Sequence, residues 1–212
     1  MLPDGLANLV DRLAALPSSE GLFNPYAPQN NPGATIRREN LTRYLGDMQS
    51  RQPGILLLFE APGYRGCALS GIPVTSERIM LKGIDKWALF GESYRATSEH
   101  PQGVAEMTAT ILWNALVEHV EQPPLIWNTV PLHPHRPGQA QSNRSPTREE
   151  ERLGLPFIEI VMALFKPETI GAVGRVAQRA LDGLGYQAIP LRHPSQGGKS
   201  EFIRGLLEIN RT

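Results

Sequence analysis

Side chains capable of chemistry follow buried segments at three separate places in this sequence of 212 residues. A carboxylate stands in residues 60–63 (Glu-Ala-Pro-Gly), an amide at Asn128, and an imidazole in residues 193–195 (His-Pro-Ser). A carboxylate can serve as a general base, an imidazole as an acid or a hydrogen-bond donor, and an amide as donor and acceptor at once. These groups form a site only if the fold brings them together.

Four apolar runs bounded by turn residues predict buried strands, at residues 54–59, 125–127, 169–173 and 186–191. Apolar residues at helical spacing predict helices over residues 6–16, 36–48, 105–120, 147–165 and 175–184. Thr147 and Glu150 have the spacing of a capping box at the start of one of them. Strands that alternate with helices predict an α/β fold, a three-layer α/β/α arrangement with a central, mainly parallel four-stranded sheet.

The loops after parallel strands lie at one edge of such a sheet, and ligands of open α/β sheets bind there. Glu60 follows the first predicted strand directly, Asn128 the second and His193 the fourth. Pro62 and Gly63 favour a tight turn that can aim backbone N–H groups into a cleft. We therefore predict that the three segments converge on one pocket at the carboxyl ends of the strands.

Each candidate also has an ordinary structural interpretation. Glu60 could cap a helix or a turn, Asn128 could bond its own backbone in a turn, and a lone histidine such as His193 is more often structural. Residues 131–146 show no recognisable element and hold four prolines, two histidines and two arginines, which favours a functional loop. His133 and His135 could suggest a metal pair, but no third ligand is clustered with them.

Composition and length restrict the class of protein. The apolar content of 41% and the charged content of 20% are those of an ordinary globular protein, and we expect residues 1–212 to form one domain that includes an N-terminal helical segment, residues 1–50. No apolar run approaches the ~20 residues that span a bilayer, and no secretory signal is recognisable, so we expect a cytoplasmic protein. The single cysteine, Cys67, excludes an internal disulfide and a four-cysteine metal site.

The formal net charge is zero, which argues mildly against tight non-specific binding to DNA. Basic residues cluster in two segments, with Arg136, Arg144 and Arg148 in one and Arg192, Lys199 and Arg204 in the other. Local basic patches and an ordinary mixed surface explain these clusters equally well.

The ordered set of motifs resembles that of the uracil-DNA glycosylase superfamily. It consists of residues 58–63 (Leu-Phe-Glu-Ala-Pro-Gly), 71–73 (Gly-Ile-Pro), 127–130 (Trp-Asn-Thr-Val) and 193–195 (His-Pro-Ser). The similarity is closest to branches with a Glu-Ala-Pro-Gly first motif and extends over residues 54–209. Each motif alone is common, and the ordered set is fairly specific.

The resemblance implies a DNA base-excision repair enzyme, a monofunctional glycosylase that hydrolyses the N-glycosidic bond of uracil or a related deaminated base flipped out of DNA. It implies no cofactor and no metal, and we expect a monomer with no membrane contact. The implied roles are a cradle for the base at Ala61, Pro62 and Gly63, a base reader at Asn128, a donor to the base O2 at His193, a phosphate contact at Ser195, a stacking position at Val74, and a candidate water-activating group at Glu60.

The sequence departs from the family pattern at several of these positions. No iron–sulfur cluster is expected with one cysteine, and the stacking position is Val74 rather than an aromatic residue, for which Tyr64, Tyr94 or Trp87 could substitute. A second acidic residue of the first motif is replaced by Gly66. Because Ala61 replaces an aspartate or asparagine, water activation is left open between Glu60 and positioning by backbone and Asn128.

Two alternatives to a glycosylase follow from these residues. The first is a catalytically weak or inactive DNA-binding module of the same fold, supported by the neutral charge, Val74 and Gly66. The second, argued without the resemblance, is a small-molecule hydrolase that uses Glu60 and His193. The amide at Asn128 and the basic loops favour a nucleic-acid substrate over the hydrolase.

Overall fold

The structure is a computed structural model that describes residues 4–29, 31–195 and 197–210. In chain order, its elements are α1 (Asp4–Ala14), β1 (Leu22–Phe23), α2 (Ala34–Arg51), β2 (Ile55–Phe59), α3 (Cys67–Ser70), α4 (Glu77–Lys82), the 3-10 helix η1 (Asp85–Trp87), α5 (Met107–His119), β3 (Leu125–Asn128), β4 (His133–Pro134), α6 (Arg148–Phe165), β5 (Thr169–Val173), α7 (Arg175–Gly183), β6 (Ile189–Leu191) and α8 (Lys199–Ile209).

Four parallel strands form the central sheet, in the order β3-β2-β5-β6. Leu56, Leu57 and Leu58 of β2 are each 0% exposed, because this strand is covered on both faces. The register places Phe59, the last residue of β2, beside Asn128, the last residue of β3. The predicted α/β fold with a mainly parallel four-stranded sheet is therefore confirmed.

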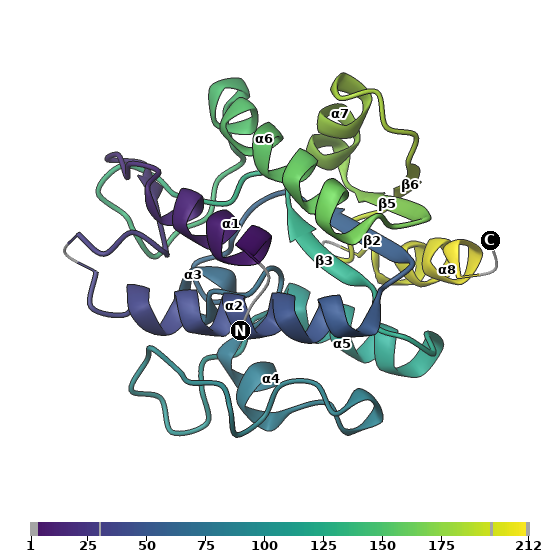
Figure 1. The fold of residues 1–212 in the computed structure, drawn as a ribbon, viewed down its shortest axis with the longest axis horizontal. Helices are drawn as coiled ribbons and strands as arrows, with labels where there is room; N and C mark the ends of the chain where they lie inside the picture. Colours follow the sequence, from purple (N-terminus) through teal and green to yellow (C-terminus); the bar gives the residue numbers. More distant parts are fainter. Residues whose placement is uncertain (1–3, 30, 196, 211–212) are drawn as a thin grey trace.

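Helices cover both faces of this sheet and complete a three-layer α/β/α arrangement (Figure 1). α6 and α7 pack together on one side, and α5 and α8 on the other. α2 covers the open edge of β3, where the Tyr44 hydroxyl accepts a hydrogen bond from the Ile126 backbone N–H at 2.9 Å. That contact supplies a partner to an edge strand that would otherwise present an unpaired donor. Within the described ranges, no helix combines the length and apolar character needed to cross a bilayer.

Two glycines allow helices to approach the ends of the strands closely. A Cβ atom at Gly154 of α6 would lie 1.7 Å from the backbone oxygen of Thr129, the residue after β3. A Cβ atom at Gly198, the N-cap residue of α8, would lie 2.1 Å from the backbone oxygen of His193. Real Cβ atoms do not approach oxygen so closely, so glycine is required for α6 and α8 to hold the Asn128 and His193 segments where they are.

Most predicted elements are confirmed with ends that differ by a few residues. The capping box of α6 is also confirmed, because the Thr147 hydroxyl accepts from the Glu150 N–H and the Glu150 carboxylate accepts from the Thr147 N–H. The strand predicted over residues 186–191 is shorter and begins at Ile189. Pro190 lies at its centre and cannot donate a ladder hydrogen bond, which a short edge strand tolerates.

The expectation of no element within residues 131–146 is wrong. β4 lies there and pairs antiparallel with β1 in a two-residue ribbon. A pair of residues is too short to produce a periodic pattern, so its partner strand determines it. α8 was also missed, although its buried residues Phe202, Leu206 and Ile209 have helical spacing.

Candidate active site

The first two candidate segments meet at the end of β2. The Phe59 carbonyl accepts hydrogen bonds from the Thr129 N–H at 2.7 Å and from the Thr129 hydroxyl at 2.8 Å. The Glu60 carbonyl accepts from the Val130 N–H at 3.0 Å. Pairing therefore continues past the last sheet residues and fixes Glu60 and Asn128 at the same edge.

The third segment reaches the same point from β6. The His193 ring packs edge-on against the Phe59 ring, with centroids 6.0 Å apart and an interplanar angle of 82°. Phe59 thus touches His193 through its side chain and adjoins Asn128 through the strand register. The geometry brings residues 60–63, Asn128 and His193 together at the carboxyl edge of the sheet, as the strand order requires.

Ser195 fixes the protonation pattern of His193. The Ser195 backbone N–H donates to His193 Nδ1 at 3.2 Å, and the Ser195 hydroxyl oxygen lies 2.7 Å from the same nitrogen. Since a backbone N–H can only donate, Nδ1 is an acceptor and the neutral ring carries its proton on Nε2. Burial, and then the positive charge of Arg192, lower the pKa of His193. The ring is therefore a neutral Nε2–H donor of fixed orientation near neutral pH.

Asn128 carries a polar group that no residue of the described chain satisfies. The residue is 2% exposed, and its Oδ1 is buried without a hydrogen-bond donor among the described residues. An unsatisfied buried carbonyl costs about 1–3 kcal/mol, so such groups call for an explanation. The alternative of a turn-forming Asn128 does not supply one, because no backbone N–H of the described residues donates to this oxygen.

Glu60 lies half-buried at the end of β2 and is directed toward α6 and α7. Burial is the largest cause that raises the pKa of its carboxyl, a hydrogen bond from Ser145 lowers it, the charge of Glu151 raises it and Arg179 lowers it. Ser145 and Arg179 thus partly compensate for the lost hydration. Sequence reasoning missed Ser145, whose only signal was its place two residues before the N-cap Thr147 of α6.

The loop after Glu60 lies against the carboxylate of Glu106, which the sequence motifs did not indicate. The hypothetical Cβ atoms of Gly63 and Gly66 would lie 3.4 Å and 3.1 Å from the carboxylate oxygens of Glu106. Glu106 also accepts from the Ala109 N–H and so caps α5. Burial raises the pKa of Glu106. A carboxylate from α5 thus lies beside Gly66, where the resembling motif would carry its own acidic residue.

Val74 occupies the expected stacking position in a strained backbone conformation. Its φ is 46°, a left-handed value that β-branched residues rarely adopt. Trp113 holds this turn, since its indole N–H donates to the Val74 carbonyl at 3.2 Å. Residues in such conformations cost on the order of 1–3 kcal/mol and cluster at functional sites.

The suggested aromatic substitutes for Val74 differ in their surroundings. Tyr94 and Trp87 are 3% and 7% exposed, and they donate to the Asp47 carboxylate and the Glu121 carbonyl respectively. Both rings pack in the core, and their substitution for the stacking aromatic stays a prediction. Tyr64 is partly exposed, and its backbone N–H is held by the Asn143 side chain at 3.0 Å.

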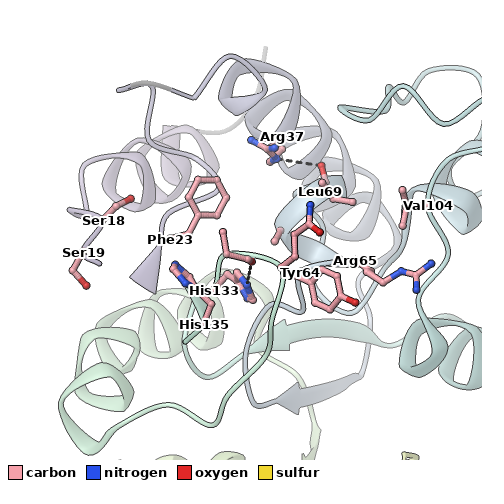
Figure 2. A pocket seen from close by; sticks show the side chains of 13 residues that line it. Ser18, Ser19, Phe23, Arg37, Tyr64, Arg65, Leu69, Val104, His133 and His135 are labelled. Atoms are coloured by element: carbon pink, nitrogen blue, oxygen red, sulfur yellow. Dashed lines mark hydrogen bonds between the residues drawn. The ribbon is translucent and has the colours of Figure 1, made fainter. Parts of the chain in front are cut away.

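A cavity of about 610 Å³ lies beside Tyr64 and Arg65, the two residues that follow the segment 60–63 (Figure 2). Its walls include Phe23, Tyr64, Arg65, His133 and His135, whereas Asn128, His193 and Glu60 do not line it. The two histidine rings stack 5.5 Å apart. In the part of the chain that the structure describes, no three His, Cys, Asp or Glu side chains gather as metal ligands would.

The fold and the site define a class of protein. It is an α/β/α domain that carries an amide, an imidazole and a carboxylate at the carboxyl edge of a parallel sheet. The family model of the uracil DNA glycosylase superfamily matches residues 46–202, about three quarters of the chain. The chain therefore belongs to the uracil DNA glycosylase superfamily. A search of curated proteins finds no match to it.

Proposed function

We propose that this protein is a monofunctional DNA glycosylase that hydrolyses the N-glycosidic bond of uracil, or of a related deaminated base, flipped out of DNA. Membership in the superfamily supports a glycosylase in general. The observation that carries the finer proposal is the surroundings of Phe59: its ring contacts the imidazole of His193, and its strand neighbour is Asn128, whose amide oxygen is buried without a donor among the described residues.

In this proposal Asn128 reads the edge of the base. Uracil presents an N3–H donor beside the O4 acceptor, which an amide can match with its own oxygen and N–H₂. The base would supply the donor that Asn128 Oδ1 lacks in the free protein. Cytosine has an acceptor at N3 and a donor at N4, so the same amide orientation would reject it.

His193 acts on the leaving base. Negative charge develops on O2 as the bond between N1 and C1′ breaks, and the Nε2–H of the neutral ring donates to that oxygen. A preorganised donor at a developing oxyanion contributes about 3–4 kcal/mol to the transition state. Ser195 supports this role by keeping Nδ1 unprotonated.

Water completes the reaction at C1′. The bond to N1 breaks with its electron pair leaving on the base, water adds its oxygen to C1′, and one water proton is lost while the base gains one. Glu60 is the candidate to accept that proton, since its raised pKa makes it a stronger base than an exposed carboxylate. The products are free uracil and an abasic site, and no cofactor takes part.

The remaining roles concern the base and the DNA backbone. Ala61, Pro62 and Gly63 would cradle the base, and Val74 would pack against its face with less contact than an aromatic ring gives. Ser195 would contact a phosphate through its hydroxyl, a role that competes with its bond to His193 Nδ1. We further propose a cytoplasmic monomer whose partner is DNA.

A second candidate is a DNA-binding module of the same fold with weak or no catalysis. Two observations favour it: Val74 in place of an aromatic ring, and Glu60 held toward Ser145 and the helices α6 and α7. Base recognition would then persist without hydrolysis.

The experiment that separates these functions uses labelled oligonucleotides with one uracil, single-stranded and double-stranded, followed by alkali. Strand scission in the presence of EDTA supports the glycosylase. DNA retention without scission supports the binding module. A protein that neither cleaves nor retains uracil-containing DNA would refute both.

A further inference from the structure

His133 is buried behind the loop that would cradle the base. The residue is 2% exposed, and its Nδ1 lies 2.7 Å from the Pro62 carbonyl oxygen. Its Nε2 lies 3.3 Å from the Ala140 carbonyl oxygen. The two residues joined by the shorter bond are 71 positions apart in sequence.

The protonation of this ring follows from its partners. A carbonyl oxygen only accepts, so the short contact requires a proton on Nδ1. Burial is the largest cause that lowers the pKa of His133, which favours the neutral ring with that single proton. A protonated ring would donate to both carbonyls, so the Pro62 carbonyl has a donor in either state.

The bond to Pro62 also sets the direction of the next N–H group. The described chain has no cis peptide bonds, and in a trans peptide the C=O and the following N–H point in opposite directions. With the Pro62 carbonyl turned toward His133, the Gly63 N–H faces away from it. That N–H has no hydrogen-bond partner among the described residues. It is therefore available to a ligand of the loop.

The backbone that carries His133 is itself fixed. His133 pairs with Phe23 in the β1–β4 ribbon. The Arg144 guanidinium donates to the Gly21 carbonyl at 2.8 Å and to the His135 carbonyl at 2.9 Å, and it pairs with Glu150. The ribbon is thus clamped to the start of α6 rather than free to move.

We infer that His133 is a positioning residue of the base site: it fixes the peptide between Pro62 and Gly63 so that the Gly63 N–H is presented to a carbonyl oxygen of the bound base. The inference rests on the proposed function, since it deepens the role of the loop. The interaction is absent from the motif series and depends on two segments that the fold alone brings together. His133 touches the loop from behind and has no contact with the reacting atoms.

A first test uses the unmodified protein and needs no activity. Nitrogen-15 NMR of the histidine side chains distinguishes a proton on Nδ1 from one on Nε2. We expect the neutral Nδ1–H form for His133 and the Nε2–H form for His193. A His133 ring with Nδ1 unprotonated would overturn the inference.

A second test compares three variants by single-turnover excision of uracil and of 5-fluorouracil, whose fluorine stabilises the departing base. We expect His133→Leu to lower the rate on uracil about tenfold or more, as part of the 10²–10³ that a whole donor contributes. The loss on 5-fluorouracil should be smaller, since a better leaving group depends less on hydrogen-bond donors. Partial misfolding would lower both rates by the same factor.

Two further variants complete the comparison. His133→Asn keeps an N–H near the position of Nδ1 and should recover most of the rate. His135→Leu removes the stacked neighbour, which lines the same cavity and bonds to the Arg136 carbonyl instead of the loop, so it should retain the rate and the substrate ratio. Equal losses in His133→Leu and His135→Leu, or an unchanged substrate ratio in His133→Leu, would refute the positioning role.

The two proposals fail in different ways. Absence of uracil release by the unmodified protein would overturn the proposed function, and the role of His133 would fall with it even if Nδ1 carries the proton. Uracil release together with an unprotonated Nδ1 would overturn the role of His133 alone.

Discussion

Replacing Asn128 with leucine should make the free protein more stable and abolish its recognition of uracil. Asn128→Leu keeps the side-chain shape and removes a buried oxygen that has no donor within the described chain. An unsatisfied group of this kind costs about 1–3 kcal/mol, and replacement by an apolar group of the same shape removes that cost. For a chain of this length, 1 kcal/mol corresponds to about 2–4 °C in Tm, so the expected rise is roughly 2–12 °C.

Activity should change in the opposite direction. The leucine side chain offers neither the acceptor for N3–H nor the donor for O4, so excision of uracil should fall by about 10² or more. Free uracil should also raise the Tm of the unmodified protein through binding to the native state and leave that of Asn128→Leu unchanged. The assays are thermal unfolding with and without uracil, and single-turnover excision from an oligonucleotide.

The neighbouring residue provides a matched control of opposite sign. Thr129 is also buried, but its hydroxyl donates to the Phe59 carbonyl at 2.8 Å. Thr129→Val therefore removes a satisfied group of similar size and should lower the free energy of unfolding by about 0.5–1.5 kcal/mol. If Asn128→Leu destabilises the protein as Thr129→Val does, or retains uracil excision, the interpretation of Asn128 as a base reader is refuted.

Three further predictions concern the other site residues. His193→Ala should lower the turnover of uracil about a hundredfold or more, and a variant as active as the parent would remove His193 from the mechanism. Ser195→Ala should leave the His193 ring less well oriented and lower the single-turnover rate about tenfold. A salt-dependent rise in KM with an unchanged rate would instead indicate that the Ser195 hydroxyl contacts a DNA phosphate. Glu60→Gln should abolish the acid limb of the pH–rate profile, which we expect above the pKa of an exposed glutamate because burial raises the pKa of Glu60. Because the pKa of Glu60 is raised in the folded protein, its contribution to stability is present at low pH and is lost as pH rises through the folded-state pKa. Glu60→Gln should therefore be more stable than the parent at pH 7 and not at pH 4. Urea unfolding at both pH values checks this, and the opposite difference would contradict it.

The parts of the fold that could be predicted from sequence are those that local patterns specify. The leucines of β2 form a continuous apolar run because both faces of that strand are buried. The capping box at Thr147 and Glu150 is likewise local, since both partners lie within one turn of the chain. Elements shorter than a period, such as the β1–β4 ribbon, carry no such pattern and depend on their partner.

The candidate site divides in the same way. The residue types at Glu60, Asn128 and His193 and their places after strands were sufficient to predict one pocket and to indicate the family. Their contacts were not predictable: Phe59 meets His193 across the β5 strand, and Glu106 reaches Gly66 from the start of another helix.

Sequence alone therefore predicted a mainly parallel α/β sheet, the residues that follow its strands and the superfamily motifs, because periodicity and strand ends are properties of contiguous residues. Only the tertiary structure decided that Asn128 Oδ1 lacks a donor among the described residues, that the Ser195 N–H donates to His193 Nδ1 and so leaves the ring proton on Nε2, and that His133 donates to the Pro62 carbonyl. Burial and hydrogen bonding of an atom depend on which distant segments surround it. The chemistry of the segments that follow the strands therefore depends on contacts that only the fold makes.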